Sequence, residues 1–297
     1  MNMTVKAPAK INLYLDVLGK RSDGYHNIRS VMQTVDLCDE ISVELDPPRR
    51  GSQLIEIVCS EAALPCDATN LAHRAAVAFF NGCGIYDYSC HINIEKHIPM
   101  AAGLAGGSTD AAAVLRLLNA MNGHPLDADS LCALGATIGA DVPFCIRCGT
   151  LYTEQIGDVM VPCHPMPCAS VVIALGGRGV STPTAYRMLD DRYGEELNRD
   201  FANVDTLTAA LHTRDLREIC ASMYNVFETV ILPSHAQARA AKEALLRYGA
   251  LGALMSGSGP AVFGIFDDEG AAESAAHRLS SIADRVFVCT TSNAVIL

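Results

Sequence analysis

The stretch 99–119 constrains the fold more than any other part of the chain, because a loop of small residues runs directly into a helical segment. Three glycines in the loop permit backbone angles that other side chains disfavour, and they allow a ligand to approach the main chain closely. Residues 111–118 are strong helix formers, so we expect a helix there with Ser108 or Thr109 as its N-cap.

This turn is suited to a phosphate group. Unpaired amides and the positive end of the helix dipole both favour an anion at a helix N-terminus. An ordinary capped turn is the alternative, but the loop holds more glycine than such a turn needs. It is not a Walker loop, because no Gly-Lys-Ser/Thr follows, and the G-x-G-x-x-G spacing of dinucleotide-binding folds is missing. We therefore predict a phosphate site of another type.

Length and charge bound the remaining possibilities. The 297 residues suit one large domain or two domains of about 150 residues, and the hydrophobic half of the sequence is enough for a sizeable core. A net charge of −11 argues against a general nucleic-acid binder. There is no run of 18 apolar residues and no secretory signal, so we expect a cytoplasmic protein that does not span a membrane.

Twelve cysteines without a secretory signal indicate a reducing compartment, in which most of them serve as small core residues. Two pairs, Cys145 with Cys148 and Cys163 with Cys168, could ligate zinc together with His164. The segment 145–148 looks like a strand, and a strand would place residues three apart on opposite faces. We therefore expect zinc binding to be absent and Cys145 and Cys148 to be buried.

Periodicity and turn signals give a coarse map in which a strand feeds the glycine loop and a helix follows it. A proline-rich linker at 162–167 divides the chain into an N-terminal domain (1–160) and a C-terminal domain (161–297). The expected strands are 3–17, 31–45, 55–59, 91–98, the run after Asp141, 171–175, a pair within 253–266, and 286–289. The expected helices are 70–80, 111–118, 129–138, one from Ser181, 204–211, 214–230, 234–248 and 271–279.

Two glycine-rich turns, a lysine on an early strand and an aspartate on a turn are compatible with phosphoryl transfer. That reaction needs the phosphates held, their charge compensated by Mg²⁺ and cations, and the attacking hydroxyl placed in line. A carboxylate such as Asp141 can take the hydroxyl proton, and Lys10 can offset the developing charge. Position alone does not single out Asp141 among 33 acidic residues, and a strand lysine often points to solvent.

Four motifs in order resemble the signature set of the GHMP kinases: Lys6–Leu13, Pro99–Asp110, Gly139–Pro143 and Met255–Pro260. The fuller pattern, which includes Asp23-Gly24-Tyr25-His26, is similar to the members that act on a methylerythritol linked to cytidine diphosphate. The resemblance runs from residue 6 to residue 260, and four motifs in order are far more specific than one.

The resemblance implies a two-domain α/β (α+β) fold with the active site in the cleft between the domains. Its N-terminal domain would be like domain 2 of ribosomal protein S5, with a left-handed crossover, and its C-terminal domain would be ferredoxin-like. The implied reaction transfers the ATP γ-phosphate to the 2-hydroxyl of the methylerythritol unit, with ATP and Mg²⁺ as cofactors. We expect a monomer or homodimer that binds this small molecule and no nucleic acid or membrane.

The resemblance also implies residue roles. Lys10 and Asp141 would be the catalytic pair, with Asn12 beside them to contact the acceptor. Ser108 is a candidate Mg²⁺ or phosphate contact, although plain N-capping explains it equally well. The implied ATP-binding residues are Asn70, Lys96, Pro99, Met100, Ala101, Ala102, Gly103, Leu104, Ala105, Gly106, Gly107, Ser108 and Thr109. The implied cytidine-binding residues are Tyr25 and His26, with Tyr186 stacked on the other face of the base.

The sequence departs from the family pattern at two positions and leaves other functions open. Ala101 and Ala105 stand where many members carry glycine, so we expect a negative φ at both. Asp110 is expected to pair with the helix dipole rather than to act on the phosphates. The alternatives are a homoserine or mevalonate type of acceptor on the same scaffold, and a non-catalytic module that binds nucleotide or zinc.

Overall fold

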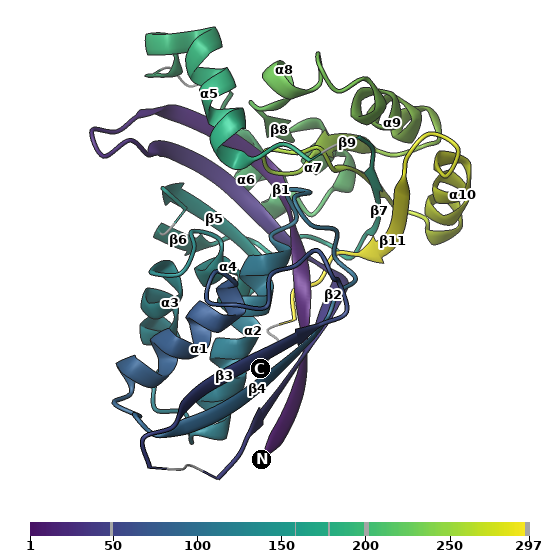
Figure 1. Ribbon diagram of the computed structural model, residues 1–297. Helices are drawn as coiled ribbons and strands as arrows, with labels where there is room; N and C mark the ends of the chain where they lie inside the picture. Colours follow the sequence, from purple (N-terminus) through teal and green to yellow (C-terminus); the bar gives the residue numbers. More distant parts are fainter. Residues whose placement is uncertain (48–49, 158, 178, 199–201, 295–297) are drawn as a thin grey trace.

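The computed structural model describes residues 1–47, 50–157, 159–177, 179–198 and 202–294. Within these residues the chain forms a seven-stranded sheet and a four-stranded sheet, and a long hairpin of β1 and β2 runs through both parts of the molecule (Figure 1). The first part consists of β1 (Asn2–Lys20), β2 (His26–Leu45), β3 (Gln53–Cys59), α1 (Leu71–Gly82), β4 (Tyr88–Glu95), α2 (Gly106–Met121), α3 (Ala128–Ala136), α4 (Val142–Arg147), β5 (Thr150–Gln155) and β6 (Val159–Pro162). The second consists of β7 (Ser170–Leu175), α5 (Thr182–Tyr193), a 3-10 turn (Gly194–Asn198), α6 (Val204–Thr213), α7 (Leu216–Ala221), β8 (Tyr224–Asn225), α8 (Glu228–Ile231), α9 (Ala236–Arg247), β9 (Gly252–Met255), β10 (Val262–Phe266), α10 (Glu269–Leu279) and β11 (Arg285–Thr290).

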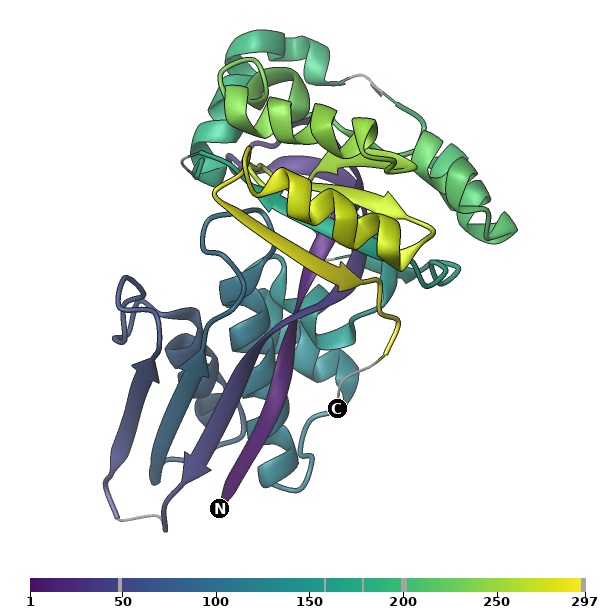
Figure 2. The same ribbon diagram turned by 90° about the vertical axis from the view of Figure 1, so that its right-hand side faces the viewer.

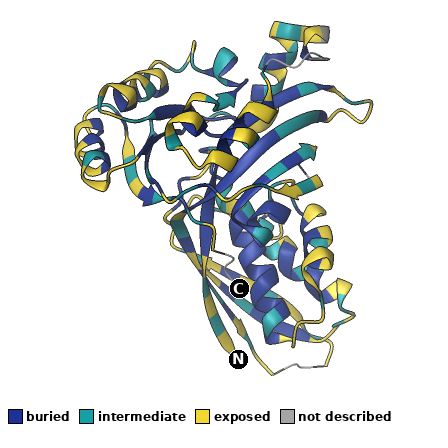
Figure 3. Cartoon of the chain, turned by 180° about the vertical axis from the view of Figure 1, so that it is seen from behind, coloured by how far each residue is buried: buried dark blue, intermediate teal, exposed yellow. Residues whose placement is uncertain are grey.

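The larger sheet has the strand order β3-β4-β2-β1-β8. In addition, β5 pairs with β2, and β6 pairs with β5. Strands β1 and β2 pair antiparallel over nearly their whole length, while β3 and β4 are parallel and are connected through α1. Helix α2 packs on β1 and β2 and is buried along most of its length (Figure 3). This burial fixes the beginning of α2, and with it the glycine loop.

The smaller sheet has the antiparallel order β11-β7-β10-β9. Helices α9 and α10 lie beside each other on one of its faces (Figure 2). This order, with a helical segment between β7 and β9 and a helix between β10 and β11, is the β-α-β-β-α-β pattern of ferredoxin-like domains. The mixed α/β fold expected for the chain is thus confirmed. No helix in the described part of the chain has the length and apolar character needed to cross a bilayer.

Strand β1 contributes to each of the three hydrophobic clusters that the described residues form. Ala7 belongs to the cluster under α1 and α2, Ile11 to the central cluster, and Val17 to the cluster under α9 and α10. Strand β8, from the second part, pairs in parallel with β1 at Tyr14 and Leu15. The two parts are therefore joined by shared strands as well as by the linker after β6.

Two expected elements are wrong. The run after Asp141 is the helix α4 and not a strand, because Pro143 in its first turn fits a helix N-terminus and a short apolar run cannot distinguish the two. The expected helix 214–230 is divided into α7, β8 and α8. Buried Asn225 causes the break: its side chain donates to the carbonyls of Met255 and Gly257 and accepts from the amide of Phe227. The other expected helices and strands are confirmed within a few residues of their ends.

Candidate active site

The glycine loop curls before α2 in a way that differs from the expectation. Helix α2 begins at Gly106, its N-cap is Ala105 and no side chain caps it, so neither Ser108 nor Thr109 is the cap. Ala101 and Ala105 have φ values of 51° and 59°, so the expected negative φ is wrong. A left-handed alanine costs about 1–2 kcal/mol, which means that the surrounding packing holds this loop in shape. The first amides of α2 are left for a ligand.

The packing that holds the loop comes from the second glycine turn, between β9 and β10. Ser256 donates a hydrogen bond from Oγ to the carbonyl of Gly103 over 2.9 Å. A Cβ on Gly103 would lie only 2.1 Å from the carbonyl oxygen of Ser256, so only glycine permits this approach. On the other side, the amide of Lys10 donates to the carbonyl of Leu104 over 3.2 Å. The loop is thus held between β1 and the second turn.

Lys10 and Asp141 face each other beside this loop. The Lys10 Nζ lies 3.9 Å from Asp141 Oδ2 and donates to Asn12 Oδ1 over 2.6 Å. Asn12 in turn donates to Ser30 Oγ over 2.8 Å, which orients its amide. Asp141 is the N-cap residue of α4 but makes no capping hydrogen bond, and 40% of its side chain is exposed. A buried ammonium thus stands beside a carboxylate that has access to solvent.

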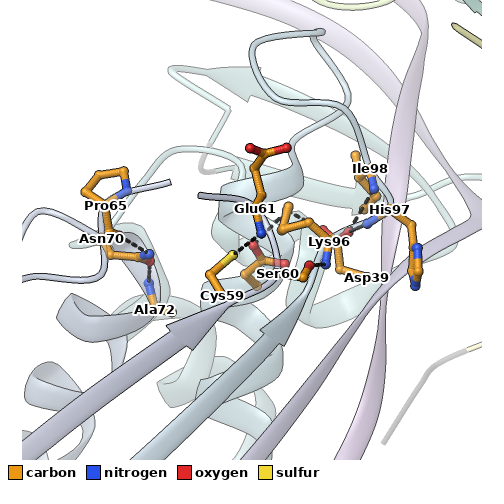
Figure 4. Close-up of polar contacts among 11 residues, drawn as sticks. Asp39, Cys59, Ser60, Glu61, Pro65, Asn70, Ala72, Lys96, His97 and Ile98 are labelled. Carbon is orange, nitrogen blue, oxygen red and sulfur yellow. Dashed lines mark hydrogen bonds and ion pairs between the residues drawn. The ribbon is translucent and has the colours of Figure 1, made fainter. Parts of the chain in front are cut away.

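One cavity of about 760 Å³ brings most of the expected site residues together. It is lined by Lys10, Asn12, Tyr25, His26, Lys96, all of residues 99–108, Asp141 and Tyr186. Asn70 and Thr109 are not among its lining residues. Asn70 instead caps α1, accepting from the amide of Ala72 and donating to the carbonyl of Pro65 (Figure 4). Thr109 is fully buried in α2.

At one end of the cavity, Lys96 is held between two buried carboxylates. Its Nζ donates to Asp39 Oδ2 and, over 2.9 Å, to Asp110 Oδ2. Asp39 also accepts from the amides of His97 and Ile98 (Figure 4). Asp110 therefore pairs with Lys96 rather than with the helix dipole alone. Burial, together with the Asp39 charge and against the attraction of Lys96, raises the pKa of Asp110 from 3.8 to about 8.

The opposite end of the cavity is aromatic. The rings of His26 and Tyr186 stack with centroids 4.7 Å apart, and Tyr25 is 64% exposed. Asp190, on α5, accepts a hydrogen bond of 2.7 Å from His26 and another of 2.7 Å from Lys20. Although burial opposes the shift, these two hydrogen bonds lower the pKa of Asp190.

Sequence reasoning missed two residues that shape the site, Asp39 and Asp190, and it gave no individual role to Ser256. Asp39 stands in an alternating strand where it looks like one more solvent-facing acid beside Glu40. Asp190 belongs to no recognisable motif, because its partners lie more than 160 residues away along the chain. Ser256 was visible as part of the second glycine turn, but the sequence did not indicate which atom it contacts.

The cysteine pairs lie elsewhere. Cys145 is in α4 and Cys148 is its C-cap residue, so the expected strand argument was wrong, but both side chains are buried as expected. Burial raises the pKa of Cys145 well above its ordinary value. Cys163 and His164 line a second hollow, of about 1170 Å³, that contains none of the expected site residues. Among the described residues, no three His, Cys, Asp or Glu side chains are grouped to hold a metal ion.

Two family models match the chain. The one described as "GHMP kinases N terminal domain" matches residues 70–149, and the one described as "GHMP kinases C terminal" matches residues 207–284. A 4-diphosphocytidyl-2-C-methyl-D-erythritol kinase of Clostridium perfringens is 43% identical over 268 residues, which are 90% of this chain and 89% of the relative. Another, of Geobacillus thermodenitrificans, is 42% identical over 287 residues, which are 97% of this chain and 96% of the relative.

Solved structures with this fold include one of the same kind of enzyme. The crystal structure of a 4-(cytidine 5'-diphospho)-2C-methyl-D-erythritol kinase has a TM-score of 0.80 and 30% identity, and the match covers 98% of this chain and all of that one. A homoserine kinase of Cytophaga hutchinsonii has a TM-score of 0.77 at 20% identity, with 100% of this chain and 96% of that chain covered. A mevalonate kinase of L. major has a TM-score of 0.76 at 15% identity, with 99% and 97% covered. These last two share the fold alone.

Proposed function

The chain belongs to the GHMP kinases, and from that premise we propose that it transfers the γ-phosphate of ATP to the 2-hydroxyl of 4-diphosphocytidyl-2-C-methyl-D-erythritol. The observation that carries this proposal is the layout of the single 760 Å³ cavity. The first residues of α2, whose amides could bind phosphates, line one end of this cavity. The aromatic rings that could bind a pyrimidine line the other end, and Lys10 and Asp141 line the same cavity.

Asp141 is the proposed acceptor of the hydroxyl proton, and Lys10 its cationic partner. The partly exposed carboxylate of Asp141 can reach a hydroxyl group in the cavity, which a fully enclosed carboxylate could not. Lys10, fixed by Asn12, supplies positive charge where negative charge develops on the transferring phosphoryl group. In this arrangement the protein mainly positions and stabilises, as phosphoryl transfer requires.

Mg²⁺ is the proposed metal cofactor, and the oxygen donors at this point of the cavity suit it. Ser108 Oγ lies 3.9 Å from the position of a Cβ on Gly139, so the hydroxyl faces the turn that carries Asp141. Hard cations of this size prefer one or two protein oxygens, with water and phosphate oxygens completing the coordination. Bound Mg²⁺ would offset phosphate charge, and Ser108 is the residue proposed to hold it.

The aromatic end is proposed to bind the cytosine. Because His26 already stacks on Tyr186, no space for a base remains between these two rings. The base is therefore proposed to lie beside the stacked rings of His26 and Tyr186, where the exposed ring of Tyr25 can contact it. His26 is held by Asp190, so one ring nitrogen is fixed in direction. A homoserine or mevalonate acceptor would make no use of these rings, and the similarity to those kinases is one of fold.

A substrate panel tests the proposal. Purified protein with ATP and Mg²⁺ should release ADP with the cytidine-diphosphate-linked alcohol and not with homoserine or mevalonate; a preference for either of these would contradict it. D190N, which releases His26 and Lys20, should raise KM for the alcohol about tenfold and leave KM for ATP unchanged. D191N, at an exposed neighbouring position on the same helix, is the matched control and should behave like the wild type.

A further inference from the structure

The carboxylate of Asp39 holds two parts of the nucleotide end at once. Its Oδ2 accepts from Lys96 Nζ, while its Oδ1 accepts from the amides of His97 and Ile98 over 2.6 and 2.8 Å. Those amides belong to the segment that leads from β4 directly into the glycine loop at Pro99. Asp39 is fully buried on β2, a strand fixed on both sides by its neighbours. One rigid side chain thus anchors the entrance to the loop (Figure 4).

Lys96 extends this anchor to the beginning of α2. A Cβ on Gly106 would lie 3.2 Å from Lys96 Nζ, so the ammonium rests against the first residue of the helix. Asp110, one turn further along α2, accepts the second hydrogen bond of this ammonium. Lys96 also lines the cavity. The triad of Asp39, Lys96 and Asp110 therefore connects β2, the loop entrance and α2 at the place where the phosphates are proposed to lie.

The triad is compatible with a nearby polyphosphate only if its net charge is zero. Two carboxylates and one ammonium would leave one negative charge buried beside the phosphate site, which is costly both by desolvation and by repulsion. Asp110 Oδ1 is buried without a hydrogen-bond partner among the described residues, a state that suits a neutral carboxyl group better than a carboxylate. A proton on Asp110 makes the triad neutral.

We propose that Asp39 is a positioning residue for nucleotide binding, which through Lys96 and the amides of His97 and Ile98 fixes the glycine loop relative to α2. This inference rests on the proposed function, because it assumes that the nucleotide phosphates lie on that loop. It predicts a selective effect: loosening the anchor weakens ATP binding and spares the acceptor end, which lies on the other side of Lys10.

The test is the variant D39N, which keeps an oxygen acceptor for the two amides but removes the charge that holds Lys96. We expect the Kd for ATP with Mg²⁺, measured by titration calorimetry, and the KM for ATP to rise about tenfold, which corresponds to about 1.4 kcal/mol. KM for the alcohol and kcat should stay within about threefold of the wild type. Rises in both KM values by the same factor would show a general structural defect and overturn the inference.

The matched control is D36N. Asp36 lies on the same strand, and its carboxylate also accepts hydrogen bonds, but from the amide and hydroxyl of Thr290 on β11. An equal loss of ATP affinity in D36N, or unchanged affinity in folded D39N, would refute the role of Asp39. If D39N does not fold, the double change D39N/K96Q leaves no buried ammonium unpaired. It should show the same rise in Kd, and a Kd within about twofold of the wild type would overturn the inference.

The calorimetric measurement separates this inference from the proposed function. ATP binding needs no acceptor, so the Kd comparison remains decisive even if the alcohol proves not to be the substrate. Conversely, wild-type turnover of the alcohol with an unchanged Kd in D39N would support the function and reject the positioning role.

Discussion

Two lysine–aspartate groups lie at the same cavity. They differ in burial and in whether the ammonium is hydrogen-bonded to the carboxylates. Lys96 lies between two carboxylates that are almost completely buried, and it is hydrogen-bonded to both. Lys10 stands 3.9 Å from Asp141, whose side chain is 40% exposed. Both lysines touch the glycine loop region, Lys10 through its amide and Lys96 through its ammonium.

The difference separates the group that we propose to be structural from the one that we propose to be reactive. Breaking a buried, hydrogen-bonded ion pair leaves an unpaired charge in the interior, so the Lys96 group has little freedom to exchange partners with a ligand. The distance between Lys10 and Asp141 is longer than a hydrogen bond, and the carboxylate of Asp141 is open to the cavity. A substrate hydroxyl can therefore replace solvent at this carboxylate without breaking a buried ion pair. We therefore assign different roles to the same residue types in one cavity.

The largest expected effect is that of D141N, which tests the reactive side of this comparison. Removing the carboxylate should lower kcat by about 10² to 10⁴-fold, because no other group is proposed to take the hydroxyl proton. The Kd for ATP should stay within about twofold, measured by calorimetry alongside coupled ADP release. D129N, at an exposed aspartate that pairs with Arg147, is the control and should keep wild-type kcat. A near-normal kcat in D141N would remove Asp141 from the mechanism.

An intermediate effect is expected for G103A, which disturbs the loop that both groups share. The new Cβ would lie 2.1 Å from the carbonyl oxygen of Ser256, so the two glycine turns must separate. We expect KM for ATP to rise at least about tenfold and the free energy of unfolding to fall by about 3 kcal/mol or more, the sum of overpacking and backbone strain. Activity assays and urea denaturation measure the two quantities.

G123A isolates the strain from the clash. Gly123 has a φ of 77°, against 79° for Gly103, but a Cβ on it would meet nothing within 4 Å. This variant should lose only about 1–2 kcal/mol and keep its KM for ATP. If G103A and G123A proved equal in both measurements, the contact between the two turns would have no energetic importance.

The last expected effect concerns the buried Lys96 group and the pH dependence of the free energy of unfolding. Burial raises the pKa of Asp110 from 3.8 to about 8, so the folded protein is expected to keep a proton on this carboxyl at pH values at which the unfolded chain has released it. The folded state therefore binds more protons within this window, and the free energy of unfolding falls as pH rises through it, by at most about 1.4 kcal/mol per pH unit. D110N should flatten this slope in urea denaturation between about pH 6 and pH 8. An unchanged slope would show that Asp110 is ionised in the folded protein.

Part of this site could be predicted from the sequence because its residues lie in local motifs. The strand with Lys10, the glycine loop and the turn with Asp141 each have a recognisable composition, and the order of the motifs gave the family. Local composition cannot report a contact between distant segments. For that reason the stacking of His26 on Tyr186 and the anchoring of Lys96 by Asp39 could not be predicted.

The errors also have physical causes. Alanine has no preference for positive φ, so nothing at Ala101 or Ala105 signals the left-handed turns that packing imposes. Helix α4 is only six residues long and apolar, so its periodicity could not be distinguished from that of a buried strand. At 214–230 the local helix preference was overridden by the side chain of Asn225, which connects β8 with the second glycine turn.

The path of β1 through all three hydrophobic clusters has a consequence for any attempt to treat the halves as exchangeable modules. A fragment that starts after the linker would lack Leu15 and Val17, which fill the cluster under α9 and α10, and it would lack the partner of β8. In a chimaera joined at the linker, the side chains of β1 must therefore fit the C-terminal half taken from the other protein. Otherwise the β1–β2 hairpin must be taken from that protein as well.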